Sequence, residues 1–96
     1  VSESLNVNAP VVLLVDDQAI VAEAIRRLLE DEVGIVFHYC QDPAKALEVA
    51  AQVRPTLILL DLVMPGVDGM TLVRFFHAHP KLRRVPIIVL SSKEDP

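Results

Sequence analysis

Three unbroken apolar runs stand out along the chain, at residues 11–15, 57–60 and 86–90. They show no alternation of apolar and polar side chains, which is typical of parallel strands that are covered on both faces. A fourth segment, residues 35–40, is less apolar and contains His38, so it is predicted to be a strand at the edge of the sheet. The pattern therefore predicts four strands.

Between these strands, apolar residues recur at helical spacing. The spacing predicts helices over residues 20–30, 42–53 and 70–77. The second helix is expected to begin at Asp42-Pro43, a capping residue followed by proline in the first turn. The order β-α-β-α-β-α-β calls for right-handed crossovers, and it predicts an α/β fold with a parallel sheet.

Length and composition set limits on this fold. Ninety-six residues allow one small domain, and 52% hydrophobic but only 4% aromatic residues predict a core of aliphatic side chains. Residues 1–10 contain Ser, Asn and Glu and few apolar residues, so they are interpreted as a loose leader, and without a basic and a long apolar region they are not a secretory signal. No apolar run reaches membrane-spanning length, and a net charge of −4 with scattered basic residues argues against nucleic-acid binding. With a single cysteine, Cys40, these features predict a cytoplasmic protein without membrane or direct nucleic-acid contact.

Acidic side chains follow two of the predicted strands. Asp16 and Asp17 come directly after the first strand, and Asp61 comes directly after the third. If these two strands are neighbours in a parallel sheet, the three carboxylates converge at their carboxyl ends. Open α/β sheets bind their ligands just beyond these strand ends. The mutual repulsion of the carboxylates favours the binding of a hard cation such as Mg²⁺. This ion would neutralise the charge of an incoming phosphoryl group, and one carboxylate could then attack phosphorus. Ser91, after the fourth strand, offers a hydroxyl to a phosphoryl oxygen.

Three blocks of this sequence resemble the receiver domains of response regulators in two-component signalling. The blocks are Val15-Asp16-Asp17, the run Asp-Leu-Val-Met-Pro-Gly-Val-Asp-Gly at residues 61–69, and residues 86–92. The resemblance covers nearly all of the chain after the leader. It implies a flavodoxin-like or CheY-like parallel sheet with the strand order 2-1-3-4.

The resemblance also implies roles for individual residues. Asp61 is then the phosphoacceptor, and Mg²⁺ binds to Asp17, Asp61 and the backbone carbonyl of Val63. Asp16 helps to hold the ion through water, and Ser91 is the switch hydroxyl. The implied function is Mg²⁺-dependent phosphoryl transfer to Asp61 from a sensor histidine kinase or a phosphotransfer protein. The chain is thus expected to regulate an output domain and not to be an enzyme itself.

Three further expectations follow, the first two of them from the same resemblance. The amino-acid sequence of residues 15–18, 61–69 and 86–96 is similar to the receiver half of WspR-type diguanylate cyclase regulators, which implies a GGDEF diguanylate cyclase as the output domain. The family continues with a fifth strand, whose lysine contacts the phosphoryl group, and with last helices. We therefore expect residues 11–96 to be a C-terminally truncated receiver domain with impaired phosphorylation. The uncovered edge at residues 86–90 favours a homo-oligomer that pairs or exchanges elements.

Two other functional interpretations remain open at this point. One is a dimerisation or interaction module that is not phosphorylated. The other is a phosphohydrolase with an aspartyl nucleophile, but such enzymes usually carry a second acid two residues further on, where this chain has Val63. Taken singly, Asp16 is interpreted as a loop acid, Asp17 as a helix cap and Ser91 as an ordinary strand-end serine. Only their combination with Asp61 favours a site.

Overall fold

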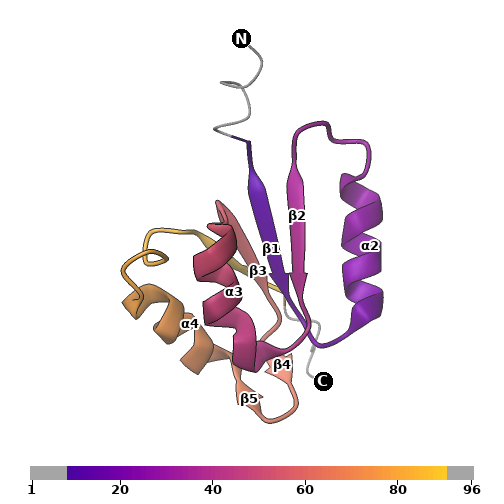
Figure 1. The fold of residues 1–96 in the computed structure, drawn as a ribbon. Helices are drawn as coiled ribbons and strands as arrows, with labels where there is room; N and C mark the ends of the chain where they lie inside the picture. The colour runs from indigo at the N-terminus through magenta and orange to yellow at the C-terminus, as the bar shows by residue number, and fades with distance from the viewer. Residues whose placement is uncertain (1–8, 91–96) are drawn as a thin grey trace.

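The computed structural model describes residues 9–90 of the chain (Figure 1). Its larger sheet contains four parallel strands in the order β2-β1-β3-β6. These strands are β1 (Val11–Val15), β2 (Val36–Cys40), β3 (Leu57–Leu60) and β6 (Ile87–Val89). Since β6 is the fourth predicted strand, the α/β fold, the order 2-1-3-4 and the edge position of β2 are confirmed. The predicted leader, residues 1–10, lies almost wholly outside the described residues.

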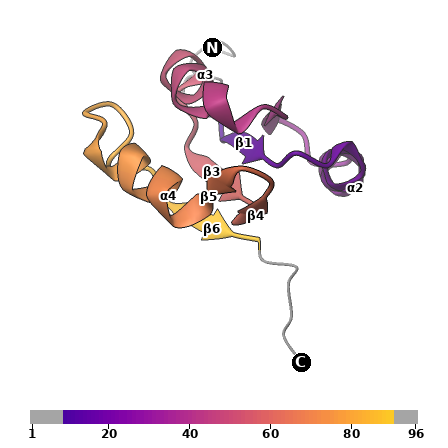
Figure 2. The ribbon, with the colours of Figure 1, turned by 90° about the horizontal axis from the view of Figure 1, so that it is seen from below.

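The helices of the described region cover both faces of this sheet. They are α2 (Ala19–Leu29), α3 (Ala46–Val53) and α4 (Gly69–Ala78). Figure 2 shows α2 on one face, with α3 and α4 on the other. Because helices lie on both faces, four of the five residues of β1 are buried, which explains its unbroken apolar run. Of the helices described, none has the length and apolar character needed to cross a membrane.

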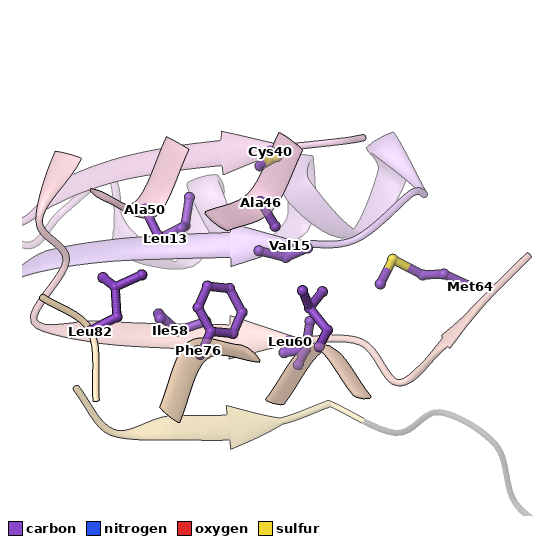
Figure 3. Packing of buried hydrophobic residues seen from close by; sticks show 11 residues of the cluster. Leu13, Val15, Cys40, Ala46, Ala50, Ile58, Leu60, Met64, Phe76 and Leu82 are labelled. Atoms are coloured by element: carbon purple, nitrogen blue, oxygen red, sulfur yellow. The ribbon is translucent and has the colours of Figure 1, made fainter. Parts of the chain in front are cut away.

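The main core lies between the sheet and the α3–α4 layer (Figure 3). Alternate residues of β1 and β3 point into it, as the period of a strand requires. The small side chains of Ala46 and Ala50 allow α3 to approach the sheet closely, and Phe76 of α4 is the largest fully buried side chain. The buried cluster consists of Leu13, Val15, Cys40, Ala46, Ala50, Ile58, Leu60, Met64, Leu72, Phe76 and Leu82.

Two aspartates begin helices, and the predicted helix start at Asp42 is confirmed. The Asp42 side chain accepts a hydrogen bond from the Ala44 N–H at 3.0 Å, and the first turn is a 3₁₀ turn, η1 (Pro43–Lys45), before α3. The Asp68 side chain accepts from the Met70 N–H at 3.1 Å and caps α4. Both carboxylates satisfy backbone donors that have no partner within the helix.

The connection from β3 to α4 differs from the prediction. Pro65-Gly66 and Asp68-Gly69 are turn signals that predict only turns there. The structure instead forms an antiparallel hairpin of β4 (Val63–Met64) and β5 (Val67–Asp68). Gly66 lies at its turn with φ of 75°, a conformation that glycine adopts without strain. Strands of two residues are too short to show an alternating pattern, so the pattern gives no signal for them.

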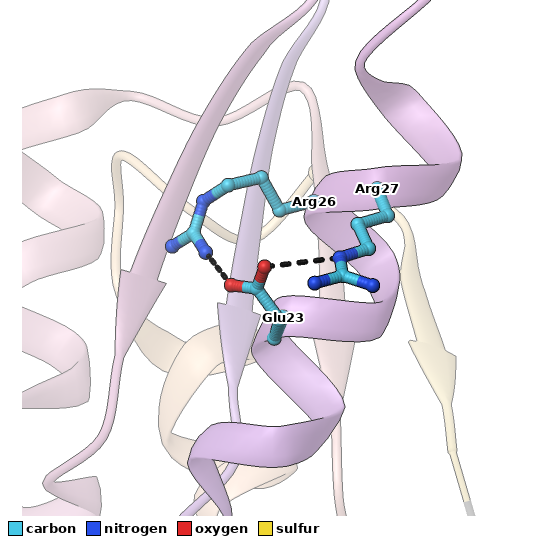
Figure 4. A network of polar contacts seen from close by, with 3 residues as sticks. All are labelled: Glu23, Arg26 and Arg27. Atoms are coloured by element: carbon cyan, nitrogen blue, oxygen red, sulfur yellow. Dashed lines mark hydrogen bonds and ion pairs between the residues drawn. The ribbon is translucent and has the colours of Figure 1, made fainter.

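Helix α2 turns part of its apolar surface to solvent. Ile20 is 74% exposed and Leu28 is 76% exposed. On the exposed side, the Glu23 carboxylate pairs with Arg26 and with Arg27, whose Nε lies 3.2 Å from Glu23 Oε2 (Figure 4). Glu23 and Arg27 stand four residues apart, a spacing that predicts this pair on a helix, and the structure confirms it. Exposed pairs of this kind contribute little to stability.

Strand β6 has one partner, β3, among the described residues. Ile88 is 49% exposed and Val89 is 40% exposed, whereas the residues of the interior strands β1 and β3 are buried or only partly exposed. The homo-oligomer that would cover this edge remains a prediction.

We expect the neighbours Phe75 and Phe76 to differ sharply in their effect on stability. Phe76 is 0% exposed and Phe75 is 53% exposed. Phe76→Ala should lower the free energy of unfolding by about 3–5 kcal/mol, because it leaves a cavity in the main core. Phe75→Ala should change it by only about 0.5 kcal/mol. Urea denaturation of both variants measures the difference, and equal losses would contradict this packing.

Gly69 is expected to resist replacement for a steric reason. A Cβ atom at this position would lie 2.6 Å from Leu62 Cα and 2.9 Å from the Leu62 carbonyl oxygen. Alanine is favoured over glycine within helices by about 1 kcal/mol. Gly69→Ala should nevertheless destabilise the domain by about 1–3 kcal/mol, because the backbone must move apart. A gain in melting temperature would show that α4 and Leu62 are not packed this closely.

Candidate metal centre

The acidic residues meet where β1 and β3 leave the sheet. These strands are parallel neighbours, with Val15 paired to Leu60, so their carboxyl ends lie side by side. The Asp61 N–H continues the ladder and donates to the Val15 carbonyl at 3.0 Å. One carboxylate oxygen from each of Asp16, Asp17 and Asp61 lies within 4.8 Å of the others. The predicted convergence of three carboxylates is confirmed.

Two of these carboxylates are fixed by the backbone that follows them. The Gln18 N–H donates to Asp16 Oδ1 at 2.8 Å, and the Val63 N–H donates to Asp61 Oδ1 at 3.0 Å. Both hydrogen bonds close the short turn that an aspartate side chain forms with the backbone N–H of the second residue after it. Asp16 is 3% exposed and Asp61 is 5% exposed. Each therefore has one oxygen held in place by the protein itself.

Asp17 is placed differently. The helix-cap interpretation of this residue is wrong, because α2 has Gln18 at its N-cap position and no side-chain hydrogen bond caps it. Instead, Asp17 Oδ1 is buried and has no hydrogen-bond partner among residues 9–90. A buried carboxylate oxygen without a donor is unfavourable. Its position beside two other carboxylates therefore suits a bound cation.

The electrostatics of the centre point the same way. Burial raises the pKa of Asp16, the Gln18 N–H acts against this, and the charges of Asp61 and Asp17 raise it further. Among the described residues, the charges that act on Asp16 are those of other carboxylates, and Asp16 itself is largely shielded from water. Hard divalent cations with carboxylate and water ligands, such as Mg²⁺ or Mn²⁺, match this donor set.

Two predicted site residues are not tested by this geometry. The Val63 N–H bonds to Asp61 and so brings residue 63 to the centre, but a metal-binding role of the Val63 carbonyl stays a prediction. Ser91 lies outside the described residues.

The structure also brings two residues of β2 and its end to this centre that the sequence did not single out. The Gln41 side-chain amide donates to the Asp17 carbonyl at 3.1 Å. Burial and the charges of Asp16 and Asp17 raise the pKa of Tyr39, whose hydroxyl oxygen is buried. The only available signal was the expected pairing of the first two strands, which places their ends side by side without indicating a role.

Known proteins of similar sequence are longer than this chain. Protein-glutamate methylesterase/protein-glutamine glutaminase 2 of Carboxydothermus hydrogenoformans is 37% identical over 82 residues, which cover 84% of this chain and 22% of that protein. The DNA-binding response regulator MtrA of Mycolicibacterium paratuberculosis is 37% identical over 84 residues, which cover 88% of this chain and 36% of that protein. The chain therefore spans well under half the length of these curated relatives.

A solved structure and a family model complete the comparison. The crystal structure of the Mn²⁺-bound form of response regulator Rcp1 is similar with a TM-score of 0.77 at 26% identity, over 90% of this chain and 69% of that chain. The family model of the response regulator receiver domain matches residues 12–96. The sheet order, the acidic cluster and this match agree: the chain belongs to the response regulator receiver domain family of two-component signalling, with its CheY-like fold.

Proposed function

We propose that this chain accepts a phosphoryl group on Asp61 in a Mg²⁺-dependent reaction. The observation that carries the proposal is the convergence of three carboxylates, one of them with a buried oxygen that lacks a donor among the described residues. The choice of Asp61 as the acceptor rests on the family's motif. Asp17, Asp61 and the Val63 carbonyl are the proposed Mg²⁺ ligands, and Asp16 acts through water.

The proposed reaction forms an acyl phosphate. A carboxylate oxygen of Asp61 attacks phosphorus, the bond from phosphorus to the donor's histidine nitrogen breaks, and the imidazole leaves with that electron pair. Bound Mg²⁺ would offset the charge that the carboxylates and the phosphoryl oxygens bring together. The Val63 N–H holds Asp61 Oδ1, which fixes the direction from which the other oxygen approaches phosphorus.

The partners of this reaction follow from the family. A sensor histidine kinase or a phosphotransfer protein is the proposed donor, in the cytoplasm. Residues 11–96 are the proposed receiver unit, after the leader at residues 1–10. Ser91 is the proposed switch hydroxyl that donates to a phosphoryl oxygen and shifts a two-state equilibrium.

The output remains a proposal of its own. The two relatives named above carry different functions in their names, methylesterase and DNA binding, so the receiver unit does not fix the output. A GGDEF diguanylate cyclase is the output that we propose, on the similarity of wording to WspR-type regulators. Self-association through the β6 edge is proposed because Ile88 and Val89 are exposed there.

Asp61→Asn is expected to abolish acyl-phosphate formation, because an amide cannot serve as the nucleophile. The intact protein is incubated with Mg²⁺ and acetyl phosphate. Its mass is then followed for the gain of one phosphoryl group that hydroxylamine removes. Asp68→Asn is the matched control. Asparagine caps helices about as well as aspartate, so this variant should keep the label. An Asp61→Asn protein that still gains the label contradicts the assignment.

Asp16→Asn should have opposite effects with and without metal ion. Without metal, the variant should melt at a higher temperature, because it removes a buried charge beside two others, and its Oδ1 can still accept from the Gln18 N–H. With Mg²⁺ present, this advantage should shrink or reverse, since the ion loses one partner charge. Thermal unfolding in EDTA and in Mg²⁺ measures both effects.

The control for this experiment is Asp42→Asn, which changes an exposed aspartate outside the acidic cluster. It should leave the response to Mg²⁺ as in the wild type. An Asp16→Asn variant that melts lower than the wild type in EDTA would show that the three carboxylates do not repel one another strongly.

A further inference from the structure

The end of β2 holds the backbone that carries Asp16 and Asp17. In the parallel ladder, Tyr39 is paired with Leu14 and Cys40 with Val15, so β2 ends next to the acidic turn. The Asp16 N–H donates to the Cys40 carbonyl at 3.3 Å. The turn at Asp16 and Asp17 is thus tied to an edge strand that carries no acidic residue of the cluster.

Gln41 adds a second tie to the same turn. Its side-chain amide donates to the Asp17 carbonyl at 3.1 Å. Asp17 lies in a bend between β1 and α2, and no side-chain hydrogen bond caps α2. This contact holds the Asp17 backbone together with the hydrogen bond from the Gln18 N–H to the Asp16 side chain.

Two buried side-chain polar atoms in the described region lack a hydrogen-bond partner there. They are Asp17 Oδ1 and the hydroxyl oxygen of Tyr39. While the carboxylate is ionised, Asp17 Oδ1 can only accept a hydrogen bond, and the Tyr39 hydroxyl can donate one. The two atoms are chemically complementary, and the charges of Asp16 and Asp17 both act on Tyr39. Buried polar groups in native proteins are normally paired with each other or through ordered water.

We propose that Tyr39 is a positioning residue for the metal centre: its hydroxyl donates through one ordered water to Asp17 Oδ1, because neither atom has a protein partner among the described residues. This contact orients the carboxylate that binds Mg²⁺, while Gln41 fixes the backbone of the same residue. The inference rests on the proposed function, because it assumes that Asp17 is a metal ligand. Partners that orient a metal-binding side chain typically contribute about 10–100-fold to metal affinity.

The chain offers a sensitive test, because it contains one tyrosine and no tryptophan. Tyrosine emission therefore reports on residue 39 alone. In the wild type, titration with magnesium chloride should change this emission along a saturating curve, because the charge beside the hydroxyl changes. The midpoint should agree with the Mg²⁺ affinity measured by calorimetry.

Three variants separate positioning from packing. Tyr39→Phe removes only the hydroxyl and should weaken Mg²⁺ binding about tenfold in calorimetry, with an unchanged circular dichroism spectrum. Gln41→Ala should also weaken binding. The double variant Tyr39→Phe/Phe37→Tyr keeps the fluorophore and moves it two residues back along the same face of β2. It should bind Mg²⁺ as weakly as Tyr39→Phe, and its emission should no longer follow the titration.

The outcomes distinguish this inference from the proposed function. A wild-type chain that binds no Mg²⁺ overturns the proposed function and this inference with it. A wild type that binds Mg²⁺ without any change in tyrosine emission overturns the inference alone. So does a Tyr39→Phe variant that binds Mg²⁺ as tightly as the wild type.

Discussion

The parallel pairing of β1 with β3 is the constraint on which the acidic centre depends. Register pairs Val15 with Leu60, so the residues that follow, Asp16 and Asp61, must leave the sheet side by side. The carboxylates are brought together by backbone hydrogen bonds and not by any attraction of their own. Their repulsion is therefore built into the fold, and a bound cation is the simplest way to relieve it.

The core explains how the fold tolerates this repulsion. Leu13 and Val15 of β1, and Ile58 and Leu60 of β3, are fully buried beneath α3 and α4. Separating the two strands would expose this packed layer, which opposes the local repulsion with many small contacts. The charged residues lie just beyond the last buried pair, so the core fixes the backbone that carries them, and Asp16 and Asp61 are themselves buried.

Much of this arrangement could be predicted because it follows from long, regular signals. Three unbroken apolar runs and a fourth, less apolar segment predicted the strands. The aspartates directly after two of these strands predicted the acidic centre. The β4–β5 hairpin could not be predicted, since two-residue strands carry no periodicity. The contributions of Tyr39 and Gln41 were missed for another reason. They depend on which side-chain atoms are paired after folding and which are not, and an edge strand of mixed polarity does not reveal that.

The block from Asp61 to Gly69 combines chemistry with architecture. Met64 is buried in the core, Gly66 makes the hairpin turn and Asp68 caps α4. Gly69 allows α4 to pack against the backbone of Leu62, directly after Asp61. One residue of this block has the proposed reactive group, and its neighbours set where that group lies. A motif of this kind is specific because several independent steric requirements must be met within nine residues of sequence.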